Sequence, residues 1–322
     1  MKQHKLLSLL LALLLALSLL AGCGSPADEP EETEEPAIEE TVEEPAEEPE
    51  EDETEELDEA AVIWEATTAY YDSITEENST WNMVPFADAL PLIEDNPEAV
   101  IVVDMRGADD YAEGHIPGAV HIPYAEIGEK MDVLPANRQI MVYCFTGQTS
   151  GQAVAAMQLM GFNAVSLQGG MNFGWAPLEL DEDTLETEAN ELPEANADWT
   201  PEQEILLAAI NDHFTQGTNY IVRPPEVYDL IEGSPEAIDI VDIRNQEAYD
   251  EGHIEGAVLI PFPEVGERMD EFSTTKPVYV SCFSGQTAGQ TILNLRLNGI
   301  NAMSVYRGMR GWTGEEMPVV TN

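Results

Sequence analysis

The sequence has few basic residues. Its 322 residues include 12 Lys and Arg against 63 Asp and Glu, which gives a formal net charge of −51. Twenty of the acidic residues lie within 28–59, and the rest of the chain is still strongly acidic. Nucleic acids and anionic lipid surfaces are bound through clustered Lys and Arg. The shortage of these residues argues against both kinds of partner and predicts weak electrostatic attraction of small anions.

Cysteine is also scarce. The chain has Cys23, Cys144 and Cys282, with no CxxC pair and no cluster of His and Cys. The pattern therefore indicates no zinc site, no other metal and no cofactor. Exported proteins normally pair their thiols, so a disulfide between Cys144 and Cys282 is one structural alternative. It is the less favoured one, because equivalent positions of tandem domains seldom face each other.

The chain has no apolar run of about 20 residues, which is the length that a membrane-spanning helix needs. A shorter run at 6–21 follows Lys2 and Lys5 and leads into a Leu-Ala-Gly-Cys sequence that ends at Cys23. This order is typical of a secretory signal, and its end resembles a bacterial lipobox. The resemblance implies a signal peptide over 1–22 and lipid on Cys23; an ordinary signal peptide is the alternative. We expect a cell-envelope protein, held on the extracytoplasmic side by its lipid anchor alone.

Two segments have no aromatic residue and few large apolar ones. Residues 25–59 are almost all Glu, Asp, Pro, Thr and Ala, and such a composition cannot bury enough surface to fold. We expect a disordered, extended spacer over 23–56, with a specific acidic interaction tail as the alternative. Residues 179–196 are similarly acidic, and we expect a linker over 181–197.

A cysteine loop is present twice. The run Cys144-Phe145-Thr146-Gly147-Gln148-Thr149 recurs 138 residues later as Cys282-Phe283-Ser284-Gly285-Gln286-Thr287. The same offset relates many positions between 83 and 171 to the second half without a gap. A period this long indicates a duplicated domain, since solenoid repeats have periods of about 20–50 residues. We expect one domain over 57–180 and another over 198–322, each opened by a helix.

Each copy alternates short apolar runs with helical patterns. In the first copy, 100–103 and 140–143 are entirely apolar and predict buried strands. This alternation predicts an α/β domain with a doubly wound parallel sheet, whose ligands lie at the carboxyl ends of the strands. Cys144 and Cys282 both fall there, before a Gly-bearing loop and a helix. Backbone N–H groups and the helix dipole can stabilise a thiolate in that position, which favours a reactive Cys over a small buried hydrophobe.

These elements resemble the rhodanese superfamily. An Asp-x-Arg segment, a Gly-His-Ile…Gly-Ala segment and the cysteine loop occur in the same order in both copies. The resemblance implies two tandem rhodanese-like domains, each with a parallel five-stranded sheet flanked by helices. It also implies that Cys144 and Cys282 accept sulfane sulfur as persulfides and pass it to a nucleophile. The implied partners are a small sulfur donor and a thiol or other nucleophilic acceptor.

Successive loop amides can stabilise a negative persulfide, because Gly147 and Gly285 let the backbone turn inward without a Cβ clash. The expected donors are Phe145, Thr146, Gly147, Gln148, Thr149 and Ser150 in the first copy, and Phe283, Ser284, Gly285, Gln286, Thr287 and Ala288 in the second.

One departure concerns the donor. Many rhodanese loops carry a basic residue five positions after the Cys, where this chain has Thr149 and Thr287. Thiosulfate is a dianion, so we expect little activity with it and favour a less charged persulfide or polysulfide. The missing anion clamp also argues against phosphatase and arsenate-reductase chemistry. A binding or sensing module with incidental thiols is the alternative to a sulfurtransferase.

The supporting polar residues have structural explanations. Asp104 and Asp242 are expected to cap the loops that follow them. Structural hydrogen bonding is expected for His115 and His253, each of which lies in a turn. The roles of Gln148 and Gln286 remain open between donating to bound sulfur and beginning a helix. The supporting arginines, Arg106 and Arg244, are expected to pair with nearby carboxylates such as Asp109 and Glu247.

Overall fold

The computed structural model describes residues 57–74, 80–181, 184–195 and 197–321. The predicted signal peptide, the lipidation site Cys23 and the predicted spacer over 23–56 lie outside the described residues. Within the described ranges, no helix is both long and apolar enough to cross a membrane.

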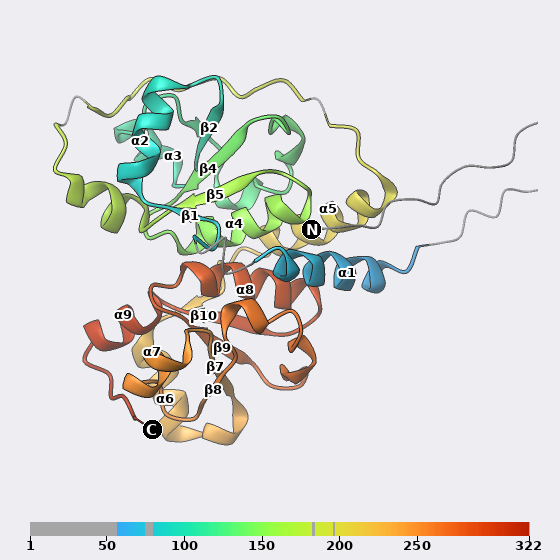
Figure 1. Cartoon of the computed structure of the whole chain (residues 1–322), viewed down its shortest axis with the longest axis vertical. Helices are drawn as coiled ribbons and strands as arrows, with labels where there is room; N and C mark the ends of the chain where they lie inside the picture. The colour runs from blue at the N-terminus through green and yellow to red at the C-terminus, as the bar shows by residue number, and fades with distance from the viewer. Residues whose placement is uncertain (1–56, 75–79, 182–183, 196, 322) are drawn as a thin grey trace, which may run out of the picture. The chain divides into compact units, whose positions relative to one another are not determined.

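The described chain contains two parallel five-stranded sheets with the same strand order (Figure 1). The first sheet has the order β1-β5-β4-β2-β3, and the second has the order β6-β10-β9-β7-β8. We call residues 80–181 lobe 1 and residues 220–321 lobe 2. The prediction of two tandem α/β domains is therefore confirmed. The strands of lobe 1 are Met83–Val84, Val100–Asp104, Val120–His121, Gln139–Tyr143 and Ala164–Leu167; those of lobe 2 are Ile221–Val222, Asp239–Asp242, Ala257–Leu259, Val278–Ser281 and Ala302–Val305.

The sequence of the inner strands explains this architecture. Every residue of β2 is buried, and so is every residue of β4 after Gln139, because helices cover both faces of the sheet. Strands buried on both faces are continuous apolar runs rather than alternating ones. The helices of lobe 1 are α2 (Phe86–Asp95), α3 (Ala108–Glu113) and α4 (Gln148–Leu159); those of lobe 2 are α6 (Pro224–Gly233), α7 (Gln246–Glu251), α8 (Gln286–Leu297) and α9 (Gly308–Gly314).

Short helical turns take the place of a continuous helix after β3. Residues 124–134 form only η2 (Tyr124–Glu126) and η3 (Met131–Val133). Between them lies Gly128, where an added Cβ would meet the Cα of Asn211 at 2.6 Å. The backbone at this point is shaped by a neighbouring helix rather than by its own helical pattern. Similar turns are η4 (Met171–Trp175), η5 (Ala176–Leu178), η7 (Pro235–Ala237), η8 (Phe262–Glu264) and η9 (Met269–Glu271).

The helix that precedes each lobe packs on the other lobe. In α1 (Glu59–Asp72), the ring of Tyr71 lies 5.7 Å from that of Phe262 in lobe 2. In α5 (Pro201–Thr215), the ring of Phe214 lies 4.8 Å from that of Tyr124 in lobe 1. The two helices thus cross between the halves of the chain, and their apolar side chains join both halves in one core.

The closest approach between the lobes is that of α4 to α8. A Cβ added at Gly151 would overlap the carbonyl oxygen of Gln286, and one added at Gly289 would overlap that of Gln148. These two glycines are equivalent positions of the duplication, so the contact is nearly symmetric. Glycine is otherwise a poor residue for a helix interior. Its presence at both positions is explained by the need for the two backbones to touch.

Substitution of Gly151 tests this contact. We expect Gly151→Ala to lower the free energy of unfolding by about 1–3 kcal/mol or more, because the methyl group forces backbone apart from backbone. Gly233, at the end of α6, has open space at its Cβ position, so Gly233→Ala is expected to be neutral or stabilising by about 0.4–1 kcal/mol. Urea unfolding of both variants measures the difference. A Gly151→Ala protein as stable as Gly233→Ala would contradict the contact.

Candidate functional site

The two cysteines lie at equivalent places in the two sheets. Cys144 directly follows β4 and Cys282 directly follows β9, which are inner strands. Both thiols are free, and both residues are buried, with 4% and 2% of their surfaces exposed. The alternative of a Cys144–Cys282 disulfide is therefore wrong. The strand-end position predicted from the sequence is where the structure places them.

One backbone amide points at each sulfur. The Sγ of Cys144 accepts a hydrogen bond from the N–H of Gly147 at 3.1 Å, and the Sγ of Cys282 accepts one from Gly285 at 3.0 Å. Gly147 and Gly285 have φ of +84° and +91°, a left-handed conformation that glycine adopts without strain. This conformation turns the loop so that the amide of the third residue after the Cys faces back to the thiol.

The helix after each loop supplies further donors. The first three residues of α4 are Gln148, Thr149 and Ser150, and the N–H groups of a first helical turn have no partner inside the helix. The aligned peptide dipoles also favour negative charge at this end. Of the six expected donors, the Gly147 amide is the one that bonds to the Cys144 thiol in the described structure.

A hydroxyl distinguishes the two sites. The Oγ of Ser150 lies 3.6 Å from the Sγ of Cys144 and 2.8 Å from the Oγ of Ser166. Ala288 occupies the equivalent position in lobe 2, so Cys282 has no hydroxyl from this position. The Cys144 site is therefore the more polar of the two.

Each Asp-x-Arg segment forms a buried ion pair. The Nη2 of Arg106 lies 2.7 Å from a carboxylate oxygen of Asp104, and Arg244 pairs with Asp242 at 2.6 Å. The prediction that these arginines pair with nearby carboxylates is therefore confirmed, but Asp109 and Glu247, named as examples, are not the partners. The carboxylate two residues before each Arg is fully buried and already accepts the backbone N–H of that Arg, so it is the nearer partner. These bonds also confirm that both Asp residues cap the loops that follow them.

The arginines support the aromatic residue after each Cys. The guanidinium carbon of Arg106 lies 5.8 Å from the ring centroid of Phe145, and that of Arg244 lies 5.6 Å from that of Phe283. Burial alone would lower the pKa of Arg106, but its hydrogen bonds and charge interaction with Asp104 leave that pKa above its ordinary value. Arg106 therefore stays charged while it is paired with Asp104. The ring of Phe145, which is 41% exposed, lies over the Arg106 guanidinium group.

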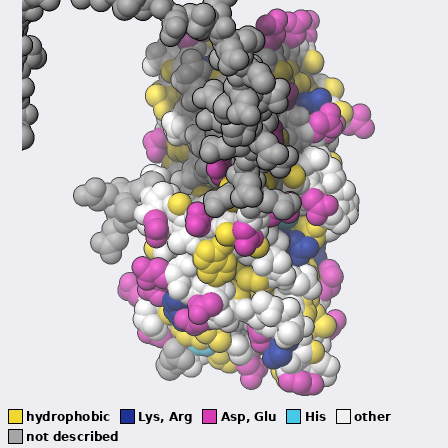
Figure 2. Space-filling model, turned by 90° about the vertical axis from the view of Figure 1, so that its right-hand side faces the viewer, with side chains coloured by type: hydrophobic (Ala, Val, Ile, Leu, Met, Phe, Trp, Pro, Cys, Tyr) yellow, Lys and Arg dark blue, Asp and Glu magenta, His cyan; other side chains and the backbone are white. Residues whose placement is uncertain are grey.

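A cleft of about 860 Å³ opens beside Cys144 and is lined by both halves of the chain. Lobe 1 contributes the Cys loop and Arg106; lobe 2 contributes Arg223 and Tyr306. No Asp or Glu is among the described residues that line it. On the face drawn in Figure 2, by comparison, acidic side chains are scattered and Lys and Arg are few. The acidity of the whole chain therefore does not extend to the described lining of this cleft.

Each of the two arginines that line the cleft nevertheless has a carboxylate partner. Arg223 lies over the ring of Tyr306 at 4.6 Å and within 3.7 Å of the Glu315 carboxylate. Arg106 has Asp104. Neither Arg223 nor Tyr306 could be found from the sequence, since both are far along the chain from Cys144 and belong to the other lobe.

The glutamines of the loops join the two lobes. The side-chain amide of Gln148 donates to the carbonyl oxygen of Val305 at 3.0 Å and accepts the N–H of Arg307 at 3.0 Å. Gln286 likewise donates to the Oγ of Ser166 at 3.0 Å and accepts the N–H of Gly169 at 3.0 Å. Both residues begin a helix, and their amides are engaged away from the thiols. Of the two roles left open by the sequence, the structure shows the one in which the glutamines begin a helix.

The remaining predicted loop residues divide between two cavities. Thr146 and Thr149 line the cleft beside Cys144. Ser284 lines a smaller pocket between the lobes, which Thr146 also reaches. Thr287 and Ala288 are buried at the start of α8.

The histidines of the Gly-His-Ile turns are structural. The Nδ1 of His115 lies 2.8 Å from the carbonyl oxygen of Tyr111, and that of His253 lies 2.8 Å from the carbonyl oxygen of Tyr249. Each imidazole also stacks on the ring of the same Tyr at 3.7 Å. No group of three or more His, Cys, Asp or Glu that could hold a metal occurs among the residues described.

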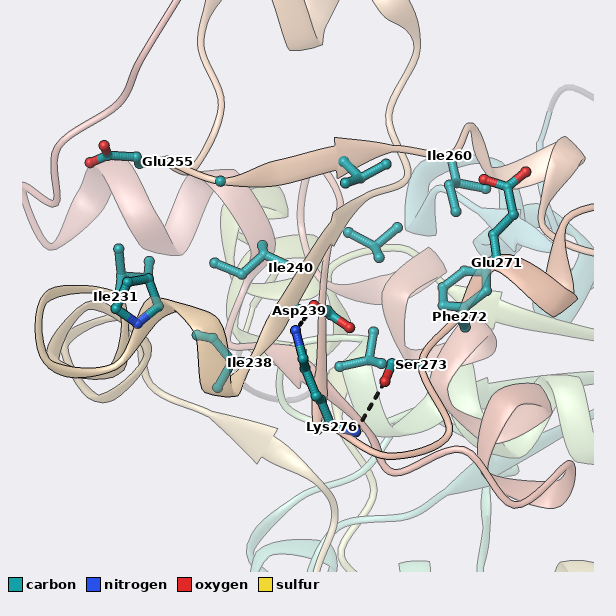
Figure 3. Close-up of a pocket in the computed structure, with 15 residues that line it drawn as sticks. Ile231, Ile238, Asp239, Ile240, Glu255, Ile260, Glu271, Phe272, Ser273 and Lys276 are labelled. Atoms are coloured by element: carbon teal, nitrogen blue, oxygen red, sulfur yellow. Dashed lines mark hydrogen bonds and ion pairs between the residues drawn. The ribbon is translucent and has the colours of Figure 1, made fainter.

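A further cavity lies in lobe 2, and Figure 3 shows its apolar walls with Lys276 paired to Asp239 at 3.3 Å. It has a volume of about 370 Å³. Asp239 is the first residue of β7 and Val278 the first of β9, so the cavity reaches the amino edge of the sheet. Ligands of parallel sheets bind at the carboxyl ends of the strands, where Cys282 lies, and Cys282 is not among the described lining residues of this cavity.

Residues 87–176 and 223–315 match the family described as Rhodanese-like domain. The two matches span more than half of the chain, which therefore belongs to the rhodanese-like domain family. It is 26% identical over 270 residues to the 3-mercaptopyruvate sulfurtransferase of Escherichia coli K12, covering 69% of this chain and 91% of that protein. It is 35% identical over 83 residues to the putative sulfur carrier protein YrkF of Bacillus subtilis, covering 26% of this chain but only 45% of that protein.

Two solved structures are similar to parts of the chain. A rhodanese-like domain protein from Staphylococcus aureus is 26% identical, covers 32% of this chain and 97% of that chain, and has a TM-score of 0.29. A thiosulfate sulfurtransferase from Pseudomonas aeruginosa is 16% identical, covers 74% of this chain and 45% of that chain, and has a TM-score of 0.31. Of the two curated relatives named above, the Escherichia coli protein is a sulfurtransferase.

A buried histidine supports the wall of the Cys144 cleft, and its protonation state makes the stability of the protein depend on pH. The Nε2 of His213 in α5 lies 2.9 Å from the Oε1 of Gln152, which also accepts the hydroxyl of Tyr124. Burial, and secondarily the charge of Arg296, lower the pKa of His213 to about 3. Between that value and the unfolded value of about 6.5, the unfolded chain binds a proton that the folded chain excludes.

We therefore expect the free energy of unfolding to fall as pH drops below about 6.5, by up to about 1.4 kcal/mol per pH unit from this residue. His213→Gln removes the titrating group and should flatten the slope between pH 6.5 and 4. Urea unfolding of both proteins across this range measures it. Parallel slopes would contradict a neutral buried imidazole at this position.

Proposed function

We propose that the protein is a sulfurtransferase that carries sulfane sulfur as a persulfide on Cys144 and on Cys282. The observation that carries the proposal is the bond from the Gly147 and Gly285 amides to the two sulfurs, repeated in both lobes. Membership of the family and the sulfurtransferases among the relatives support it.

The geometry supports a two-step transfer. The Cys thiolate attacks the outer sulfur of a persulfide R–S–SH, the S–S bond breaks, and its electron pair leaves with R–S⁻. The new Cys–S–SH carries its outer sulfur toward the first helical turn, whose amides stabilise negative charge there. A second thiolate then attacks that outer sulfur, and the Cys leaves as the thiolate. The net change moves one sulfur atom and needs no oxidant or reductant.

Mass spectrometry tests the proposal directly. After exposure to polysulfide, the intact protein should gain one sulfur, about 32 Da, for each loaded thiol. Cys144→Ser and Cys282→Ser should each lose one addition, and an acceptor thiol should remove what remains. No addition at either thiol would favour the alternative, a rhodanese-fold binding or sensing module.

We further propose that the donor is a persulfide or polysulfide rather than thiosulfate. Neither Cys loop carries a cation, and the two arginines of the Cys144 cleft each have a carboxylate partner. A dianion in this cleft would therefore gain little on binding, whereas a less charged donor loses little there.

A gain-of-function variant tests the donor class. Thr149 lines the cleft and has no cationic neighbour within its own loop. We expect Thr149→Arg to raise the kcat/KM of thiosulfate:cyanide transfer at least about tenfold, because it adds a charged clamp for the dianion. Thr149→Gln is the uncharged control of similar length. High thiosulfate turnover in the unaltered protein, lost in the Cys→Ser variants, would refute the proposed donor.

We also propose that the protein is anchored on the extracytoplasmic side of the cell envelope through lipid on Cys23. The support is the apolar run at 6–21 and the Leu-Ala-Gly-Cys sequence that follows it. Fatty-acid labelling in cells should mark the parent protein and not Cys23→Ser. Equal labelling of both, or of neither, would remove this proposal and leave the sulfur chemistry untouched.

A further inference from the structure

A pocket of about 280 Å³ lies between the two Cys loops. Thr146 and Ser284, the second residues after Cys144 and Cys282, both line it, so it touches both loops at once. The polar lining is completed by Gln168, Gln286, Arg307 and Arg310, and the described lining residues include no Asp or Glu. Apart from Thr146, the pocket shares no described lining residue with the cleft beside Cys144. It carries positive charge in an acidic protein.

Arg307 and Arg310 have no carboxylate within ion-pair distance among the described residues. Six of the ten described Lys and Arg side chains are in ion pairs. Arg138 and Arg296, which also have none, donate instead to carbonyl or amide oxygens. Arg307 is held instead over the ring of Phe173, 3.8 Å from its centroid. Two uncompensated guanidinium groups in one pocket form a site for a negative ligand.

The backbone at Arg307 supports a functional reason for this side chain. Arg307 has φ of +56°, and the equivalent residue of lobe 1 is Gly169, with φ of +79°. A left-handed conformation is strained for residues other than Gly. It persists here because the N–H of Arg307 is bound by Gln148 of the Cys144 loop. Lobe 2 thus has an arginine at a position where lobe 1 has glycine, the residue best suited to this left-handed backbone conformation.

We propose that Arg307 and Arg310 bind the carboxylate of a small organic thiol or persulfide that delivers sulfur to, or removes it from, the protein. The planar fork of a guanidinium matches a carboxylate, and the pocket has room for more than a carboxylate alone. Hydroxyls of Thr146 and Ser284 add donors at the rim shared with the Cys loops. The thiol part of this ligand class rests on the proposed function.

The test measures binding without sulfur transfer. In a protein carrying Cys144→Ser and Cys282→Ser, calorimetric titration with mercaptoacetate is expected to show saturable binding. Mercaptoethanol, which lacks the carboxylate, should not bind. Arg307→Gln with Arg310→Gln should weaken mercaptoacetate binding at least about tenfold. Lys130→Gln makes a charge change of the same sign in a side chain paired with Glu129, away from the pocket, and should leave binding unchanged.

A second variant separates ligand binding from folding. Arg307→Gly copies lobe 1 and relieves the left-handed strain, so it should raise the thermal unfolding temperature while weakening mercaptoacetate binding. Unchanged binding in the arginine variants, or equal binding of mercaptoethanol, would overturn the inference. No mercaptoacetate binding, in a parent protein whose cysteines still load sulfur from polysulfide, would overturn it and leave the proposed function standing.

Discussion

The contact of α4 with α8 is the constraint on which the rest of the structure depends. Both helices begin immediately after a Cys loop, so their contact brings the two loops to one interface. Gly151 and Gly289 allow the backbones to touch, and Gln148 and Gln286 then reach strand ends of the opposite lobe. Side chains larger than glycine at this crossing would separate the lobes. The walls of the Cys144 cleft and the pocket between the loops would separate with them.

The duplication has kept this contact and changed what surrounds the thiols. Tyr143 of lobe 1 donates its hydroxyl to Asp104, and burial, followed by the charge of Asp104, raises its pKa above the ordinary value. In lobe 2 the equivalent residue is Ser281, whose buried hydroxyl has no hydrogen-bond partner among the described residues. Ser150 likewise becomes Ala288, and Gly169 becomes Arg307. The two Cys loops thus lie in different polar surroundings.

Local patterns were sufficient to predict the fold and the placement of the thiols. Apolar runs such as 140–143, followed by Cys and Gly, predict a buried strand, a strand-end thiol and a helix, because each depends on neighbours in the chain. The partners of Gln148 and the contribution of Arg223 could not be predicted, because both depend on how the lobes meet. Arg106 shows a different failure. Its true partner, Asp104, was already assigned to capping the loop, and the same carboxylate does both.

The central claim is that each thiol carries a second sulfur among backbone amides. The most direct measurement is a crystal structure of the polysulfide-treated protein, with anomalous scattering used to locate sulfur. The account predicts an added sulfur bonded to the Sγ of Cys144 and of Cys282, within about 3.5 Å of N–H groups in the first turns of α4 and α8. Thiols that stay unmodified, or an added sulfur turned away from those amides, would contradict it.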